Sequence, residues 1–150
     1  MNYYKLTICF MLLAFSSQAQ DFVTFNETNI NQITENSFVT ITLPFNVEEG
    51  YHIQSEIESI DGSLTTEITF EDNDLYEIVS NTFSKKNNEQ VVLDDEYTSD
   101  VLINEFEVTI TLKLNNNISG SRLKGELYYQ ACTDRQCLLP RTLNFQVPIK

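Results

Sequence analysis

Hydrophobic and polar residues alternate along three long runs of this chain, at residues 39–45, 106–114 and 143–149. Alternation with a period of two is typical of a β-strand that has one face on a hydrophobic core and the other in water. Shorter runs of the same character predict further strands at residues 51–56, 64–70, 75–80 and 123–131.

Turn-forming residues separate these runs, and no stretch of ten residues carries the stripe of an amphipathic helix. Pairs such as Glu-Gly, Asp-Gly and Asn-Asn stand at residues 49–50, 61–62, 73–74, 87–88, 115–117 and 119–120. Many short strands with polar turns are typical of an antiparallel β-sandwich. Pro148 lacks a backbone N–H, so we expect the last strand at a sheet edge or at a site that tolerates this loss.

One segment does not follow the alternation. Residues 85–100 are mostly polar and charged, with a few apolar residues embedded among them. We interpret this segment as a long loop between two strands, a kind of segment that is often functional inside a compact domain.

The N-terminus predicts a secretory signal peptide at residues 1–19. A polar start with Lys5 precedes an apolar run at residues 6–15, and Ser-Gln-Ala at residues 17–19 fits cleavage after Ala19. The apolar run is too short to span a bilayer, and we expect no membrane span in the mature chain. The sequence therefore predicts a periplasmic or secreted protein with one domain at residues 20–150, of 131 residues (150 minus 19).

Charge and composition exclude several classes of partner. The formal net charge of −13 repels nucleic acid and anionic lipid, so neither is expected as a partner. His52 is the lone histidine, and no free cysteine is expected beyond one pair, so we predict no metal site. We interpret His52 as a strand residue. No serine–histidine–acid group or phosphate-binding loop is visible, and no cofactor is expected.

Two cysteines are the main candidate chemistry. Cys9 would leave with the signal peptide, so Cys132 and Cys137 would remain and pair in an oxidising compartment unless something reduces them. A six-residue ring stabilises a fold by only about 2 kcal/mol. The C-x4-C spacing and acidic neighbours such as Asp134 favour protonated thiols, so the pair suits attack by a partner's thiolate better than it suits attacking. Spacing alone leaves a structural staple and a redox pair equally open.

Residues 129–140, which read Tyr-Gln-Ala-Cys-Thr-Asp-Arg-Gln-Cys-Leu-Leu-Pro, resemble the cysteine signature of the N-terminal periplasmic domain of the DsbD thiol:disulfide interchange protein family. Gly-Tyr-His-Ile at residues 50–53 is similar to that family's Gly-aromatic-His-Ile stretch. Asp-Glu-Tyr at residues 95–97 is similar to its Asp-Glu-Phe loop. The resemblance covers nearly all of the mature chain.

The resemblance implies an immunoglobulin-like β-sandwich whose cysteine pair receives electrons from a membrane electron transporter and passes them to exported thioredoxin-like proteins. It also implies a cap loop in which Tyr97 covers the disulfide until a partner docks. Asp95 and Glu96 would be the carboxylates that keep the reduced thiols from ionising. In the same way, the resemblance implies that Cys137 links to partners more often than Cys132.

Tyr129 lies three residues before Cys132, and we expect it to pack beside the disulfide, either as core or as a wall of the site. The chain departs from the family in its shorter cysteine loop, in a Tyr where the cap has Phe, and in lacking the transmembrane and C-terminal thioredoxin-like domains. Its electron source would then be another polypeptide. We predict an exported thiol:disulfide interchange domain working through Cys132 and Cys137. The alternative is a non-catalytic binding or assembly module with a structural disulfide.

Overall fold

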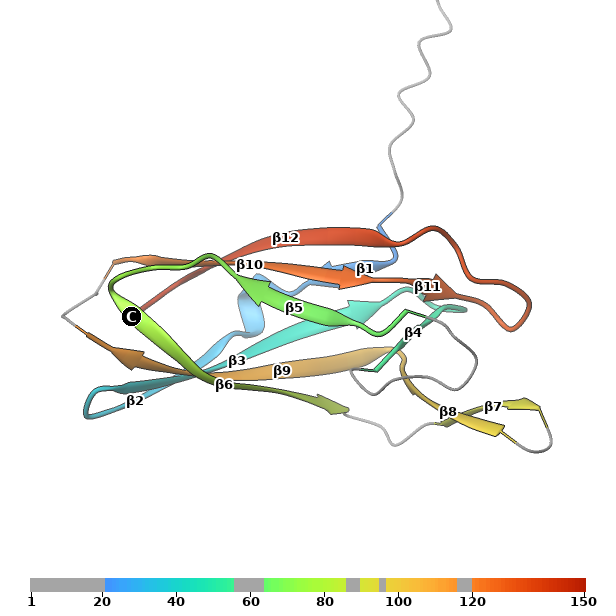
Figure 1. The fold of residues 1–150 in the computed structure, drawn as a ribbon, viewed down its shortest axis with the longest axis horizontal. Coiled ribbons are helices and arrows are strands. Elements are labelled where there is room, and N and C mark those ends of the chain that lie inside the picture. Colours follow the sequence, from blue (N-terminus) through green and yellow to red (C-terminus); the bar gives the residue numbers. More distant parts are fainter. Residues whose placement is uncertain (1–20, 56–63, 86–89, 95–96, 116–119) are drawn as a thin grey trace, which may run out of the picture.

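The structure is a computed structural model that describes residues 21–55, 64–85, 90–94, 97–115 and 120–150, with the backbone alone described at 90–94 and 97–99. Antiparallel strands form nearly all of the regular structure (Figure 1). The larger layer has the strand order β1 (Val23–Phe25), β3 (Phe38–Val47), β9 (Glu105–Leu114), β6 (Tyr76–Lys85), and β2 (Asn31–Glu35) also pairs with β3.

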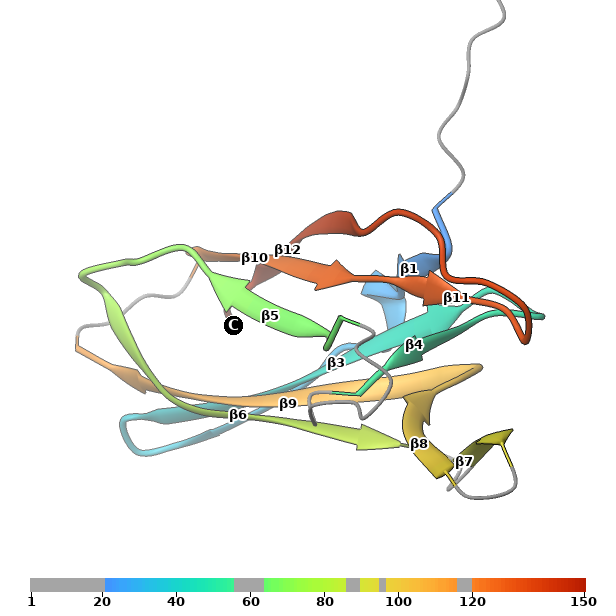
Figure 2. The ribbon, with the colours of Figure 1, turned by 45° about the vertical axis from the view of Figure 1, so that its right-hand side comes forward.

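A second layer packs over the first and has the order β12 (Arg141–Pro148), β10 (Arg122–Tyr129), β5 (Glu67–Phe70). A third sheet extends from one end of the sandwich, with the order β11 (Ala131–Cys132), β4 (His52–Gln54), β8 (Tyr97–Leu102), β7 (Gln90–Asp94). Figure 2 shows the two layers from a second direction. The predicted immunoglobulin-like antiparallel β-sandwich is confirmed. Within the described parts of the chain, no helix is long and apolar enough to cross a bilayer.

Aromatic rings join the two layers. Phe45 of β3 stacks on Phe106 of β9 with ring centroids 5.2 Å apart, and it meets the edge of Phe145 of β12 at 5.5 Å. Phe25 of β1 contacts both Phe45 and Phe145 at 5.2 and 5.1 Å. Tilted and edge-on contacts of this kind add to the hydrophobic free energy of burial. The alternating apolar residues of the long predicted runs thus supply the core.

Pro44 lies inside the central strand β3, where a missing N–H would normally break a ladder. Here β1 pairs with residues 45–47 and β2 with residues 38–42, and the 3₁₀ turn η1 (Glu27–Asn29) interrupts this side of the ladder between them. The Pro44 carbonyl accepts a hydrogen bond from the Asn26 backbone N–H at 2.9 Å. Because the two polar groups of a strand residue point to the same side, the missing donor of Pro44 faces this interruption.

The sequence-based strands correspond to β3, β4, β5, β6, β9, β10 and β12, with shifted ends. Pro148 ends β12, which is an edge strand of its sheet as expected. The long loop at residues 85–100 is a wrong prediction, because its second part forms the β7–β8 hairpin. The hairpin was missed because charged residues around Val91 and Val92 break the alternation of apolar and polar positions. Strands β1 and β2 were also missed, since each is short and only partly apolar.

Gly125 of β10 provides the first test of this packing. It pairs with Phe145 on one side and with Phe70 on the other, and an added Cβ would lie 2.4 Å from Cζ of Phe145 and 3.0 Å from Cδ1 of Phe70. We expect Gly125→Ala to lower the free energy of unfolding by about 1–3 kcal/mol, because the rings must move. Urea denaturation measures the change.

Glu126→Ala is the matched control, because Glu126 is the exposed neighbour on the same strand, and we expect a change within about 0.5 kcal/mol. An equal midpoint for the Gly125→Ala variant and the unsubstituted protein would contradict the packing described for these two rings.

Candidate functional site

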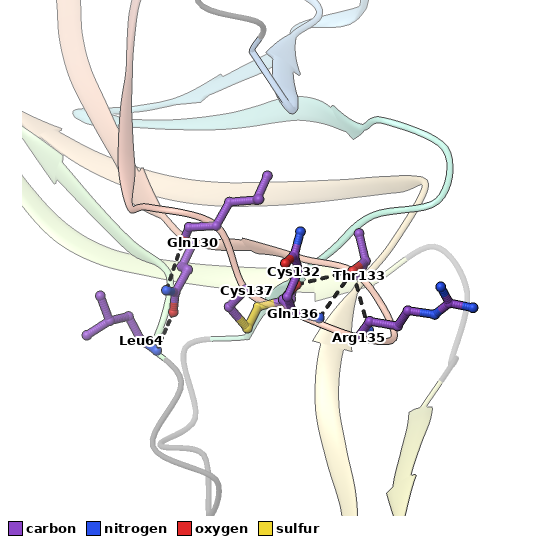
Figure 3. Close-up of a disulfide and its surroundings, with 8 residues drawn as sticks. Leu64, Gln130, Cys132, Thr133, Arg135, Gln136 and Cys137 are labelled. Atoms are coloured by element: carbon purple, nitrogen blue, oxygen red, sulfur yellow. Dashed lines mark hydrogen bonds between the residues drawn. A yellow bond between two sulfur atoms is a disulfide. The ribbon is translucent and has the colours of Figure 1, made fainter.

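Cys132 and Cys137 form a disulfide at the end of the third sheet (Figure 3). Cys132 is the last residue of β11, and Cys137 faces it across an antiparallel bridge, with the two Cα atoms 3.9 Å apart. On its other side, β11 pairs with β4, so that Cys132 lies opposite His52 and Ala131 opposite Ile53. His52, Cys132 and Cys137 therefore form one row across three neighbouring backbone segments.

The turn between the cysteines closes through its own hydrogen bonds. The Thr133 backbone N–H donates to the carbonyl of Gln136 at 2.8 Å, and the Leu138 N–H donates to the carbonyl of Ala131 at 2.8 Å. The Thr133 hydroxyl oxygen accepts from the backbone N–H groups of Arg135 and Gln136, each at 3.3 Å. This local pattern is typical of threonine in tight turns, and it shapes the loop independently of the S–S bond.

Gln130 holds this loop against a second segment. It separates β10 from β11, so it marks the point where the chain leaves one sheet and enters another. Its side-chain Nε2 donates to the carbonyl of Leu138 at 2.8 Å, and its Oε1 accepts from the backbone N–H of Leu64 at 3.2 Å. Figure 3 shows the Gln130 amide and its hydrogen bond to Leu64. The residues that follow Cys137 are thereby tied to the segment that precedes β5.

The two sulfur-bearing residues differ in exposure. Cys132 is only 5% exposed, whereas Cys137 is an exposed residue. Of the two residues, Cys137 is therefore the one that faces solvent, and Cys132 is the buried one. Leu139, two residues further on, is 85% exposed, and Leu64 on the segment tied by Gln130 is 41% exposed. Exposed apolar side chains thus stand beside the accessible cysteine.

Strand β4 is buried on both of its faces. Ile53 of β4 and Leu102 of β8, which pair with each other, belong to the hydrophobic core. His52 and Gln54 lie on the opposite face of β4 because side chains alternate along a strand. Both are buried, and His52 is 8% exposed. Cys132 shares this second face with His52, so the disulfide adjoins a buried polar surface rather than the core.

A left-handed glycine positions β4. Gly50 has a φ of +84°, and the N–H of the following Tyr51 donates to the carbonyl of Glu48 at 3.1 Å. Such a backbone strongly favours glycine, as the Glu-Gly turn signal predicted. Strand β4 begins at His52, directly after this turn. The Gly-Tyr-His-Ile stretch therefore helps to place His52 opposite Cys132.

Tyr129 lies in the hydrophobic core. Burial is the main cause that raises the pKa of its hydroxyl, and Asp21 adds to the rise. Hydrogen bonds with the backbone of Val23 and Phe22 lower this pKa in part. The hydroxyl stays protonated at neutral pH, which suits a buried structural group. A role of Tyr129 in the redox site stays a prediction.

Of the predicted cap residues, Tyr97 has a described backbone, on the strand that pairs with β4. Tyr97 is the first residue of β8, whose last two residues pair with β4, and Figures 1 and 2 show the β7–β8 hairpin near the β4–β11 end. Asp95 and Glu96 lie outside the described residues, and the side chain of Tyr97 is not among those described. The cap role of these three residues stays a prediction.

Three features of the site escaped the sequence-based reasoning. Gln130 lies inside the cysteine signature but was given no role, and Leu139 was not recognised as exposed. His52 was predicted correctly as a strand residue, yet its place opposite Cys132 was not foreseen. The short distance between Gln130 and Cys132 in the sequence was one available signal. The register that brings His52 beside Cys132 joins residues 80 positions apart (132 minus 52) and left no local signal.

Comparisons with known proteins come from structure, since no protein-family model and no curated protein sequence matches the chain. The N-terminal periplasmic domain of ScsB from Proteus mirabilis matches with a TM-score of 0.59 and 13% identity, over 86% of this chain and 47% of that one. The DsbD N-terminal domain of Neisseria meningitidis, in its reduced form, matches with a TM-score of 0.46 and 18% identity, over 79% and 82%. The GAE domain of yeast GGA1 matches with a TM-score of 0.46 and 9% identity, over 86% and 94%.

The likeness to the ScsB domain shows that this chain has the same fold, and the chain spans about half the length of that protein chain (47%). A DsbD N-terminal domain is among the structures that this chain is similar to. At these identities the likeness concerns the arrangement of strands.

The difference in exposure predicts unequal thiol reactivity. After reduction, we expect Cys137 to react with iodoacetamide about tenfold faster than Cys132, because a buried thiol is both less accessible and harder to ionise. Brief alkylation at neutral pH followed by peptide mass spectrometry gives the two rates. Alkylation of the unfolded protein, where the two thiols should react alike, is the control. Equal rates in the folded protein would contradict this description of the site.

Proposed function

We propose that this protein is an exported thiol:disulfide interchange domain that works through Cys132 and Cys137. The observation that carries the proposal is the pairing of an exposed cysteine with a buried one in a closed turn. The turn keeps its shape through the hydrogen bonds of Thr133 and Leu138 and needs the S–S bond little. A disulfide that adds about 2 kcal/mol to a loop already closed in this way is better suited to exchange than to support.

The exchange proceeds through a mixed disulfide. A partner thiolate attacks Sγ of Cys137, a new S–S bond forms between the partner and Cys137, and the Cys132–Cys137 bond breaks with the electron pair going to Cys132. A second partner thiolate then attacks the mixed disulfide, or Cys132 attacks it in the reverse direction. Two electrons move from the partner to the pair in each complete reduction, and the two cysteine sulfurs each take up one proton.

The partners proposed are exported thioredoxin-like proteins and a membrane electron transporter. The sequence resemblance suggests these partners, and the exposed Leu139 and Leu64 beside Cys137 supply an apolar contact for a protein. The predicted signal peptide at residues 1–19, with cleavage after Ala19, would place the domain in the periplasm or outside the cell.

Asp95, Glu96 and Tyr97 are proposed as the cap loop. An aromatic lid would shield the disulfide from stray thiols, and neighbouring carboxylates would oppose ionisation of the reduced pair. The pairing of β8 with β4, next to β11, supports this proposal because it joins the hairpin to the sheet that carries the disulfide.

The reduction potential of the Cys132–Cys137 pair tests the function directly. We expect a value in the range of known carriers, roughly −200 to −270 mV, from equilibration with glutathione and thioredoxin-like redox buffers. A potential below about −300 mV would mark a structural disulfide and favour the non-catalytic binding module. The Cys132→Ser, Cys137→Ser double variant is the control, since it removes the redox signal while leaving the hydrogen bonds of the turn.

Leu139 tests whether a protein partner docks beside Cys137. In a Cys132→Ser background, Cys137 should capture a thioredoxin-like protein whose active-site cysteine carries an aromatic thiol leaving group. We expect Leu139→Ser to slow this capture about fivefold or more, because a central apolar contact contributes about 1–2 kcal/mol to an interface. Release of the coloured aromatic thiolate gives the rate.

Two controls test whether the effect of Leu139→Ser is specific to docking of a protein partner. Leu139→Ser should leave the reaction of Cys137 with oxidised glutathione unchanged, because that small molecule does not need the apolar contact. Ile33→Ser removes another exposed apolar side chain, on β2, and should leave capture unchanged. If the Leu139→Ser variant captured the thioredoxin-like protein as fast as its parent, Leu139 would not belong to the docking surface.

A further inference from the structure

A row of three residues crosses the sheet at the disulfide. The antiparallel register places His52 of β4 directly opposite Cys132 of β11, and Cys132 in turn faces Cys137. Directly opposed residues of an antiparallel pair project to the same face, with Cβ atoms about 4.5–5.5 Å apart. Cys132 therefore lies between the exposed cysteine on one side and a buried imidazole on the other.

In the proposed exchange, the sulfur of Cys132 needs a proton when it leaves as a thiolate. When Cys137 is attacked, Cys132 leaves as a thiolate, and an ordinary thiol with a pKa near 8.5 is mostly protonated at neutral pH. Cys132 is 5% exposed, so bulk water has little access to its sulfur. A neighbouring group that can carry a proton would therefore assist both the departure of Cys132 and its later return.

We infer that His52 is the proton-transfer partner of Cys132 in this exchange, an inference that rests on the proposed function. In the reducing direction, the His52 imidazolium donates a proton to the leaving Cys132 thiolate. In the oxidising direction, neutral His52 takes the proton from the Cys132 thiol, and the thiolate attacks Sγ of Cys137 in the mixed disulfide and releases the partner thiolate. His52 then exchanges the proton with solvent, so that protons and electrons balance.

Other charged groups near β4 are few among the described residues. On the paired strand β8 the described charged side chain is Asp100, which forms an ion pair with Lys85. The turn that follows β11 carries Asp134 and Arg135, both exposed. Strand β11, which pairs with β4, consists of Ala131 and Cys132, so its one titratable group is the Cys132 thiol. Histidine is the side chain in this group that ordinarily changes charge between pH 5 and 8.

The pH dependence of disulfide reduction tests this assignment. The rate constant for reduction by dithiothreitol is divided by the thiolate fraction of the reagent at each pH. We expect this corrected constant to fall about tenfold between pH 5 and pH 8 in the unsubstituted protein, because the proton donor is lost as histidine titrates. The His52→Gln variant keeps a polar side chain that does not titrate. We therefore expect its corrected rate constant to be the same from pH 5 to pH 8. Parallel profiles for the two proteins would overturn the inference.

A second measurement needs no variant. The chain has a single histidine, so its ring Cε1–H signal in a proton NMR spectrum is assigned without further work. We expect the reduced protein to show a second step in the histidine titration, at the pH where the Cys132 thiol ionises, and the oxidised protein to lack it. A histidine titration that is identical in both redox states would overturn the inference, even if the His52→Gln variant failed to fold.

These results are separable from the test of the proposed function. Dithiothreitol is a strong small reductant and does not require a docking partner. A very low reduction potential, or a failure to capture thioredoxin-like proteins, would remove the function as a carrier. The corrected pH profile and the histidine titration would still decide whether His52 exchanges a proton with Cys132.

Discussion

The short pairing between β4 and β11 is the constraint on which the site depends. It spans only two residue pairs, yet it fixes which face Cys132 occupies and which residue lies opposite. A slip of one residue would turn Cys132 toward the core and bring Ala131 to the polar face. The register is held from outside this small ladder, because Ile53 and Ala131 both belong to the core cluster and cannot leave it without losing apolar burial.

The change of sheet at Gln130 explains how the sandwich carries the cysteine loop at its end. Strand β10 is paired along its whole length with β12, so its end is fixed in space. One residue later the chain enters a different sheet, and the Gln130 side-chain amide hydrogen-bonds to the backbone of Leu64 and of Leu138. The disulfide thus lies at the end of the sandwich, with Cys132 buried on a paired strand and Cys137 exposed to solvent.

Much of the sandwich could be predicted from the sequence, because each long strand has one apolar face and alternation reports that face directly. The β7–β8 hairpin could not, since residues 85–100 carry charges that break the pattern, and pairing with neighbours decides their structure instead. The cysteines were recognised from a local signature. His52 beside Cys132 required a register between distant strands, and the exposure of Leu139 depends on how the whole loop leaves the sheet.

The buried polar groups of the described residues lie together in one part of the fold. Among the described residues, the buried polar side chains are His52, Gln54, Ser55 and Thr66. All four lie on β4, just after it, or on the segment hydrogen-bonded to it, where the Thr66 hydroxyl donates to the Gln54 carbonyl and the Thr66 N–H donates to the Ser55 carbonyl at 3.3 Å.

Burial of polar groups costs free energy unless they are hydrogen-bonded, so a domain built for stability alone has little reason to gather them in one place. Here they gather on β4 and on the residues hydrogen-bonded around its end, while the aromatic core that joins the layers is apolar. The ring contacts of Phe45, Phe106 and Phe145 that join the layers are therefore separate from the polar face of β4, the face that Cys132 shares with His52.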